Sequence, residues 1–284
     1  MSARLHPPPA TGWPPAFVAQ VLDQALAAAA SGQPFAVAGL QGSGKSTLAA
    51  QLVRAAAARG RRALALSIDD FYLGRRERLR LGREVHPLCA TRGPPGTHDL
   101  ALACEVLDAL REQRPVRLPR FDKIADRRLP PSRWPLARDV DLVLFEGWCL
   151  KVPPEPPARL ARPLNRLERD EDRHGLWRGW ANQALARDYP ALWARLPRLL
   201  LLQAPGFAVV PGWRWQQERT LQAAHPGRQA MTRAQVERFV QFFERVSRQA
   251  LRTLPDIADR VVRLDAARRP RATARRRARA RPAG

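Results

Sequence analysis

Cysteine is scarce in this sequence, and long apolar runs are missing. The three cysteines, Cys89, Cys104 and Cys149, lie far apart, which excludes a disulfide framework and offers no Cys-x-x-Cys spacing for a metal. The longest stretch without charge, residues 24–44, is broken by Pro34 and by glycines, and the first residues carry prolines where a signal peptide needs an apolar core. These absences predict a soluble, cytoplasmic protein with reduced thiols and no membrane partner.

Lysine is also rare, although the chain is strongly basic. Lysine and arginine together number 49 against 26 acidic residues, a net charge of +23, yet only Lys45, Lys123 and Lys151 are lysines. Such a skew toward arginine resembles coding-sequence bias at least as much as an anion-binding surface. Eight arginines lie in residues 266–284, a tail without large apolar side chains that we expect to be disordered. The tail leaves nucleic acid open as a partner, but we do not expect one.

The composition that is present is globular, with 45% hydrophobic and 26% charged residues in a chain of 284. After an irregular N-terminus at 1–13, short apolar runs typical of buried strands alternate with amphipathic helices through one domain at 14–265, with an irregular excursion at 74–97. The expected strands are 35–39, 63–68, 140–145, 199–202 and 261–264, and the expected helices are 14–30, 46–59, 99–113 and one that begins at Thr232 and stops before Pro255. This alternation predicts an α/β fold, with a parallel sheet covered by helices on both faces.

The strongest motif runs from Gly39 to Ser46, fits the pattern G-x-x-x-x-G-K-[ST], and lies between an expected strand and an expected helix. Glycines let backbone N–H groups approach phosphate oxygens, and the helix directs the positive end of its dipole toward the same anion. Lys45 adds a charge at the β- and γ-phosphates, and the Ser46 hydroxyl is a magnesium ligand. The motif therefore predicts a P-loop that binds a nucleoside triphosphate. Its predicted phosphate-binding residues are Gly39, Gln41, Gly42, Ser43, Gly44, Lys45, Ser46 and Thr47.

Acidic residues follow two of the expected strands. Asp69 and Asp70 follow the second strand, and Glu146 follows the third. Because ligands bind at the carboxyl ends of parallel strands, these carboxylates should face the phosphates. One aspartate can accept or orient the proton of a substrate hydroxyl, and Ser46, Asp69 and Glu146 are the predicted metal ligands. The alternative is that the aspartate pair caps a turn and that Glu146 is an exposed strand-end acid.

Several segments together resemble the D-glycerate 3-kinase family, one of the P-loop kinases that also include uridine kinase, phosphoribulokinase and bacterial pantothenate kinase. The similar segments are GLQGSGKST, SIDDFYL, RGPPGTHDL, PRFDK and LFEGW, and the resemblance extends over residues 35–265. It implies a P-loop fold with a helical lid, and ATP- and Mg²⁺-dependent transfer of the γ-phosphoryl group to a hydroxyl of D-glycerate, giving 3-phosphoglycerate. The Pro-rich segment 152–157 and the arginine-rich tail depart from the family.

The resemblance also implies roles for individual residues. Asp69 aligns with the catalytic base of the relatives and Glu146 with their acid after the third strand, and the predicted catalytic residues are Lys45, Asp69 and Glu146. Arg92 and Arg120 are candidates to bind the glycerate carboxylate, because a guanidinium offers two parallel donors. For Asp99, a helix N-cap is a competing role. The predicted substrate residues are Asp70, Tyr72, Arg92, His98, Asp99, Arg120 and Asp122.

Other interpretations of the same residues stay open. The acceptor can instead be pantothenate, a nucleoside or another sugar acid, and an RNA-associated P-loop NTPase would use the basic tail. A GTPase is disfavoured, because the sequence has no N-K-x-D segment of the kind that recognises guanine. Residues 159–178 interleave arginines with acids, which predicts either a mobile lid that brings an arginine to the phosphates or an exposed helix with ion pairs.

Overall fold

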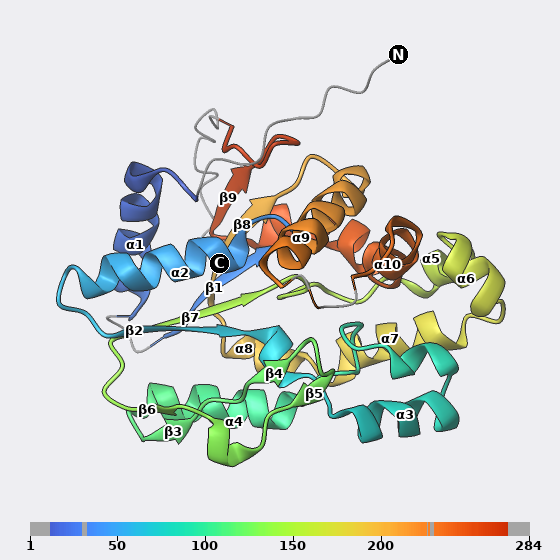
Figure 1. The fold of residues 1–284 in the computed structure, drawn as a ribbon, viewed down its shortest axis with the longest axis horizontal. Coiled ribbons are helices and arrows are strands. Elements are labelled where there is room, and N and C mark those ends of the chain that lie inside the picture. Colours follow the sequence, from blue (N-terminus) through green and yellow to red (C-terminus); the bar gives the residue numbers. More distant parts are fainter. Residues whose placement is uncertain (1–11, 30–32, 226, 228–229, 272–284) are drawn as a thin grey trace, which may run out of the picture.

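The computed structural model describes residues 12–29, 33–225, 227 and 230–271. A five-stranded parallel sheet crosses this part of the chain in the order β2–β7–β1–β8–β9 (Figure 1). The strands are β1 (Phe35–Gly39), β2 (Ala63–Ser67), β7 (Leu142–Gly147), β8 (Arg198–Gln203) and β9 (Arg260–Arg263). The expected α/β fold is thereby confirmed, and each of the five expected strands has its counterpart in the sheet.

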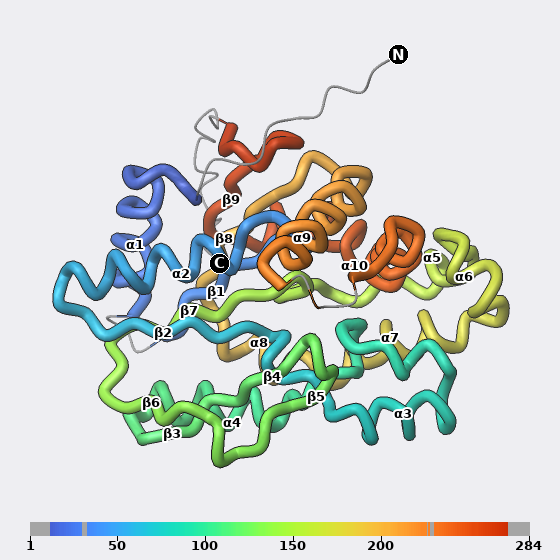
Figure 2. Tube along the Cα trace, viewed as in Figure 1, coloured from blue at the N-terminus to red at the C-terminus, as the bar shows by residue number. Residues whose placement is uncertain are grey.

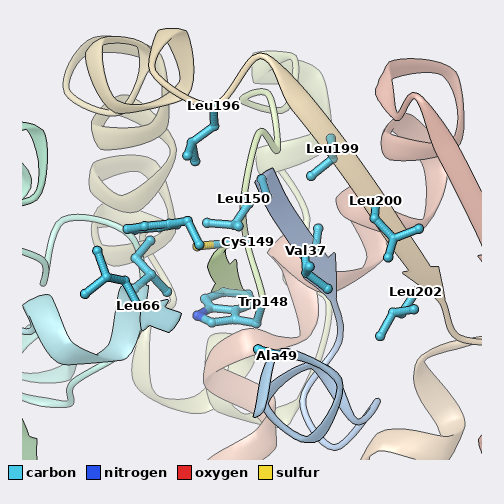
Figure 3. Packing of buried hydrophobic residues seen from close by; sticks show 14 of the residues in the cluster. Val37, Ala49, Leu66, Trp148, Cys149, Leu150, Leu196, Leu199, Leu200 and Leu202 are labelled. Carbon is cyan, nitrogen blue, oxygen red and sulfur yellow. The ribbon is translucent and has the colours of Figure 1, made fainter. Parts of the chain in front are cut away.

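The two central strands that precede the candidate site are buried along their whole length. Every residue of β1 and of β7 is buried, and because strand side chains alternate between the faces, the sheet must be covered on both sides. Helices α1 (Pro15–Ala29) and α2 (Lys45–Ala57) pack on β1 and β7, and α10 (Arg233–Ile257) packs on β8. Figure 3 shows the resulting core from Val37 of β1 to Leu200 of β8.

The remaining elements lie outside the main sheet. The further helices are α3 (Arg75–Glu84), α4 (Leu100–Arg111), α5 (Pro157–Leu160), α6 (Arg166–Glu171), α7 (Leu176–Arg187), α8 (Pro190–Ala194) and α9 (Val210–Ala224). Two small antiparallel pairs, which the sequence did not indicate, join β3 (Val116–Arg117) to β6 (Leu136–Ala137) and β4 (Phe121–Asp122) to β5 (Arg127–Arg128). Strands of two residues carry too short a pattern to detect.

The prediction of an irregular segment at 74–97 is wrong, because this segment contains α3. The helix has few apolar residues, so it lacks the periodicity that marks an amphipathic helix. It is instead held by the buried Arg78, whose guanidinium donates to the Leu73 carbonyl at 3.1 Å and to the Ala90 carbonyl at 2.8 Å. Side-chain hydrogen bonds of this kind have no periodic signature in the sequence.

Helix α10 begins as expected but ends later than expected. Thr232 and Gln235 form the reciprocal capping box that the sequence indicated. The helix does not stop before Pro255 but continues to Ile257. The proline lies in the last turn, where its missing N–H removes only one helical hydrogen bond, and the fully buried Leu254 keeps this turn packed on the core.

The two ends of the chain lie largely outside the described residues. Of the expected irregular N-terminus at 1–13, the structure describes only Gly12 and the buried Trp13. Of the tail at 266–284, it describes 266–271, which follow β9 and return so that Pro270 bridges Leu264 (Figure 2). No helix in the described ranges is long and apolar enough to span a bilayer.

Candidate active site

The loop between β1 and α2 turns through two glycines in the left-handed region. Gly42 has a φ of +77° and Gly44 a φ of +90°, and Ser43 N–H donates to the Leu40 carbonyl at 3.1 Å. Helix α2 begins at Lys45 with no side-chain cap at Gly44. The first N–H groups of the helix and the positive end of its dipole therefore face an anion placed in this loop.

Lys45 is the buried cation of this loop. It is 8% exposed, and its Nζ donates to the Leu40 carbonyl at 3.1 Å. Burial lowers the pKa of Lys45 by more than the nearby Glu146 and Asp69 carboxylates raise it. An anionic phosphate would offset the cost of burying the Lys45 charge. We therefore expect the ammonium to exchange the Leu40 carbonyl for a β- or γ-phosphate when a nucleotide binds.

Ser46 of α2 meets Glu146 at the end of β7. Ser46 Oγ donates to Glu146 Oε1 at 2.7 Å, and Glu146 is paired in register with Val37 of β1 and Ser67 of β2. A hydroxyl and a carboxylate oxygen this close fit Mg²⁺, which needs few protein ligands when phosphates and water supply the others. Among the described residues, no group of three or more His, Cys, Asp and Glu side chains could hold a metal.

Asp69 lies in η1 (Ile68–Phe71), the short 3-10 helix that follows β2. Its Oδ1 accepts from the Tyr72 hydroxyl at 2.6 Å, and its Oδ2 accepts from Lys123 Nζ at 2.6 Å. Burial alone would raise the pKa of the Asp69 carboxyl, but the charge of Lys123 and these two hydrogen bonds lower it to about 2. Asp69 is therefore ionised at neutral pH and accepts hydrogen bonds.

Asp70 has a different environment from its neighbour. It forms a capping box with Ser67, and its Oδ2 also accepts from Arg120 at 3.2 Å. Burial raises the pKa of Asp70 by more than Arg120 lowers it. The sequence allowed the aspartate pair either to cap a turn or to act in the site. In the structure Asp70 caps the turn, while the carboxylate of Asp69 binds Tyr72 and Lys123.

Lys123 is the residue that sequence reasoning missed. It lies between β4 and β5, where Asp122 Oδ1 accepts from the N–H groups of Ile124 and Ala125 at 2.9 Å each. Asp122 thus shapes the turn, and its neighbour Lys123 contacts Asp69. The scarcity of lysine could have indicated it, since Lys123 is one of three lysines among 49 basic residues and is adjacent to the predicted substrate residue Asp122.

The first and last charged residues of the segment RGPPGTHD make contacts within the protein. Arg92 is paired with Asp126, which also binds the buried Arg78 at 2.8 Å. Asp99 accepts from Leu102 N–H at 3.1 Å as the N-cap of α4, and from Arg128 at 2.9 Å. These partners anchor the segment to α3, α4 and β5.

His98, in the same segment, is buried and held on one side only. Its Nδ1 lies 2.6 Å from the Tyr189 hydroxyl, which also accepts from Gly96 N–H at 3.0 Å. The buried Tyr189 hydroxyl needs an acceptor for its own proton, and His98 Nδ1 is in reach. We therefore assign the hydroxyl as the donor to Nδ1, which leaves the proton of the neutral ring on Nε2. Nε2 is buried and has no hydrogen-bond partner in the described part of the chain. Burial outweighs the attraction of Asp69 and lowers the pKa of His98 to about 4.

The structure brings some of the predicted residues together with free or shared polar groups and binds the side chains of others to protein partners. Lys45, Ser46, Asp69 and Glu146 lie together at the carboxyl ends of β1, β2 and β7, next to Tyr72 and His98. The Tyr72 and His98 ring centroids are 5.0 Å apart, and the Tyr72 hydroxyl donates to Asp69. The side chains of Arg92, Asp99 and Asp122 are instead bound to protein partners.

The segment 159–178 contains α5, α6 and the start of α7. Arg178 is buried and donates to Asp172 at 2.9 Å, and Arg245 of α10 binds Glu168 at 2.6 Å and Glu155 at 2.8 Å. The Arg245–Glu168 pair joins this segment to α10, while the Arg178–Asp172 pair lies within the segment. Removing one partner of a buried ion pair strongly destabilises a fold, so both pairs should keep the segment in place.

A parallel sheet whose first strand leads through a P-loop into a helix, with acids at the carboxyl ends of two neighbouring strands, is typical of P-loop proteins, including the kinases of small molecules. No known family model matches the chain. It is 33% identical over 205 residues to the uncharacterized kinase mug58 of Schizosaccharomyces pombe, a match that covers 68% of this chain and 73% of that protein. The chain belongs to the family of P-loop kinases that contains the D-glycerate 3-kinases.

Two further comparisons agree with this family. The chain is 36% identical over 128 residues to the chloroplastic D-glycerate 3-kinase of Arabidopsis thaliana, a match that covers 41% of this chain and 28% of that longer protein. The structure of D-glycerate 3-kinase from Cryptococcus neoformans superimposes with a TM-score of 0.73 at 24% identity, and the match covers 91% of this chain and 98% of that one. At that identity the superposition shows the shared fold alone, and the sequence matches confirm the resemblance inferred from the motifs.

Proposed function

We propose that this protein is a D-glycerate 3-kinase that uses ATP and Mg²⁺ to phosphorylate a hydroxyl of D-glycerate, giving 3-phosphoglycerate. The observation that carries the proposal is a pair of cations bound to the carboxylates after β2. Lys123 binds Asp69 at 2.6 Å, and Arg120 binds Asp70 at 3.2 Å. When a small hydroxy acid binds with its hydroxyl at Asp69, the Lys123 and Arg120 side chains can bind its carboxylate instead. The identity to the Arabidopsis thaliana D-glycerate 3-kinase supports the same acceptor.

The nucleotide side of the reaction follows from the P-loop. Its N–H groups and Lys45 bind the β- and γ-phosphates, and Ser46 and Glu146 are the residues that would hold Mg²⁺. Bound Mg²⁺ neutralises charge on the phosphates. Because phosphoryl transfer passes through a loose transition state, positioning and charge neutralisation supply most of the catalysis.

The acceptor side depends on Asp69. With a pKa of about 2, its carboxylate is a weak base and serves first to orient the acceptor hydroxyl for in-line attack. As the hydroxyl oxygen bonds to the γ-phosphorus, the bond from this phosphorus to the β,γ-bridging oxygen breaks and ADP leaves, while the hydroxyl proton becomes acidic and passes to Asp69. The Tyr72 hydroxyl, hydrogen-bonded to Asp69 at 2.6 Å, keeps the carboxylate in place.

The test is phosphate transfer from ATP by the purified protein, with D-glycerate, L-glycerate, pantothenate and a nucleoside as acceptors. We expect turnover with D-glycerate at the highest kcat/KM. In Lys123→Met, the KM for D-glycerate should rise about ten- to hundredfold, because a charge-assisted hydrogen bond contributes roughly 1.5–3 kcal/mol. The KM for ATP should change little. Lys151→Met removes the other lysine that is not in the P-loop, which is bound to the Leu196 carbonyl, and is the matched control.

The panel also decides between acceptors. Pantothenate or a sugar acid carries the same anionic group and fits the same two cations, so a preference for one of them would keep the chemistry and change the substrate. A nucleoside has no carboxylate for Lys123. Preferred turnover of a nucleoside, or a Lys123→Met protein with unchanged KM for D-glycerate, would contradict the proposal.

A further inference from the structure

Two carbonyl groups of the P-loop are bound by side chains from opposite ends of the described chain. One is the carbonyl of Gly42 and the other that of Gly44, the two glycines with positive φ. Each glycine also packs against a tryptophan. A Cβ on Gly42 would lie 2.7 Å from Trp213 Cβ, and one on Gly44 would lie 3.2 Å from the Trp13 ring.

Trp13 holds the Gly44 carbonyl from the N-terminal side. Its indole Nε1 donates to that carbonyl at 3.0 Å, and its ring stacks on Phe17 with centroids 5.0 Å apart. The Trp13 backbone is itself fixed to α2, because its N–H donates to Gln51 Oε1 at 2.8 Å and its carbonyl accepts from Gln51 Nε2 at 3.0 Å. The indole is therefore positioned by the same helix whose first turn it contacts.

Arg268 holds the Gly42 carbonyl from the C-terminal side. Its Nε donates to that carbonyl at 2.6 Å, and its second guanidinium nitrogen donates to Gln216 Oε1 at 2.8 Å. The guanidinium lies over the Trp213 ring, 5.1 Å from its centroid, and Trp213 Nε1 donates to the Ala266 carbonyl at 2.8 Å. Figure 1 shows α9, which carries Trp213 and Gln216, beside the start of α2.

These contacts fix the orientation of the peptide planes in the loop. The plane between Gly42 and Ser43 is held at both ends, since the Gly42 carbonyl is bound to Arg268 and the Ser43 N–H to the Leu40 carbonyl. The Gly44 carbonyl is bound by Trp13 and also by Leu48 N–H at 2.9 Å. In a trans peptide the N–H points opposite to the C=O, so binding the Gly44 carbonyl directs Lys45 N–H away from the helix, toward a phosphate.

We propose that Trp13 and Arg268 are positioning residues of the nucleotide site, which keep the P-loop carbonyls away from the triphosphate and hold the loop in its phosphate-binding conformation. A carbonyl that turned inward would repel the phosphates, and reordering the loop at each binding event would cost affinity. Arg268 of the arginine-rich tail thus belongs to the kinase site. The inference rests on nucleotide binding by the proposed kinase and is independent of the acceptor.

The test measures the binding of Mg·ATP and of inorganic triphosphate with Mg²⁺ by calorimetry, without any acceptor. In Arg268→Gln the dissociation constants of both ligands should rise together, about three- to thirtyfold, less than the full effect of a lost hydrogen bond to a charged donor, because Arg268 contacts the loop and not the ligand. Trp13→Phe keeps the ring and removes the N–H, and it should raise both constants about two- to tenfold. Arg268→Lys retains a donor and should recover part of the affinity.

Two matched variants control for charge and for folding. Arg269→Gln removes the same charge from the adjacent residue, whose exposed side chain binds Asp265 at 2.8 Å, and should leave both constants unchanged. Trp134→Phe removes an indole hydrogen bond of 2.8 Å to the Leu129 carbonyl, which lies outside the P-loop, and should likewise bind normally. Thermal melts of all variants identify any that do not fold. If Arg268→Gln does not fold, the comparison of Trp13→Phe with Trp134→Phe still tests the positioning role.

The outcomes separate this inference from the proposed function. If Arg268→Gln and Trp13→Phe bind both ligands as tightly as wild type, the positioning role is wrong even if D-glycerate is phosphorylated. If only ATP binding weakens and triphosphate binding does not, Arg268 contacts the nucleoside and does not position the loop. Failure of the D-glycerate assay with normal Mg·ATP binding would contradict the acceptor alone, and absence of any Mg·ATP binding would contradict both.

Discussion

Asp69 and Asp70 are adjacent and identical, but their carboxyl groups differ in pKa and in hydrogen-bond partners. The pKa of Asp69 is lowered to about 2 by Lys123 and Tyr72, while burial raises the pKa of Asp70 despite Arg120. Asp70 also caps η1 through Ser67. The chemistry of the acceptor is therefore expected at Asp69, and a structural role is expected at Asp70.

The first prediction concerns this difference. Asp69→Asn preserves the size of the side chain and a hydrogen bond to Tyr72, but it removes the group that accepts the acceptor's proton. We expect kcat to fall by about two to four orders of magnitude, within the range attributed to general base catalysis, with the KM for ATP little changed. Steady-state kinetics with D-glycerate and ATP measure both parameters.

Asp70→Asn is the control for this substitution. Because Asp70 lies in a capping box, its replacement should lower the free energy of unfolding by about 1 kcal/mol and leave most of the turnover. Equal losses of turnover in the two variants would show that Asp69 has no special role. Retained turnover in Asp69→Asn would exclude it as the base.

The loop that carries His98 is shaped by its packing on two helices. Gly96 has a φ of +89°, its N–H donates to Tyr189 at the start of α8, and a Cβ there would lie only 2.3 Å from Trp180 of α7. Thr97 closes the loop from inside, since its Oγ1 accepts from Gly93 N–H at 2.9 Å and donates to the Pro94 carbonyl at 2.7 Å. The position of His98 thus depends on α7 and α8.

The second prediction follows from this packing. Gly96→Ala introduces both a strained φ and an overlap with the Trp180 ring, so we expect the free energy of unfolding to fall by about 2 kcal/mol or more. His98 should also shift, which raises the KM for the acceptor more than the KM for ATP. Urea denaturation and steady-state kinetics measure the two effects.

Gly179→Ala in α7 is the matched control for Gly96→Ala. This glycine lies inside a helix with nothing within 4 Å of an added Cβ, so alanine should stabilise the protein by about 0.5–1 kcal/mol. If Gly96→Ala were equally well tolerated, the close approach of the loop to α7 would not hold in solution.

The whole molecule places its P-loop among segments that are distant in sequence. Trp13, the α9 residues and Arg268 surround the loop, and Lys123 reaches the site from a hairpin outside the main sheet. Burying ionisable groups in such an assembly couples the site to global stability. His98 is the clearest case, because its pKa lies near 4 in the folded protein and near its ordinary 6.5 in the unfolded chain.

The third prediction is the resulting pH dependence. Between pH 6.5 and 4 the unfolded chain binds a proton at His98 that the folded protein excludes, so the free energy of unfolding should decrease as the pH falls through this range. One such group accounts for up to about 1.4 kcal/mol per pH unit. Urea denaturation from pH 7 to pH 4.5 measures the slope.

His98→Asn supplies the comparison for the pH slope. Without the imidazole, the decrease in stability between pH 6.5 and 4.5 should be smaller than in the wild type. Identical slopes for the two proteins would show that His98 is protonated as readily in the folded protein as in the unfolded chain. Asp69 contributes little in this window, because the stability from its lowered pKa is lost mainly as the pH falls from about 3.8 toward about 2.

Much of the fold could be predicted because its signals are local. The strands of the main sheet are continuous apolar runs, and the glycines and Lys45 of the P-loop lie within a few residues of each other. Helix α3 could not be predicted in this way, since it is held by the hydrogen bonds of Arg78 and has no apolar stripe. The roles within PRFDK were equally hidden, because Asp122 and Lys123 are adjacent and only the turn decides which one reaches Asp69.

The amino-acid sequence by itself determined the class of chemistry, since a P-loop and strand-end acids are defined by residues that are close along the chain and by the period of the strands around them. Tertiary structure alone decided the partners of those residues. Lys123 meets Asp69 across 54 positions, and Arg268 meets Gly42 across 226. Such contacts give no pattern in the sequence, because they depend on how the fold brings distant side chains together and not on the residues adjacent in the chain.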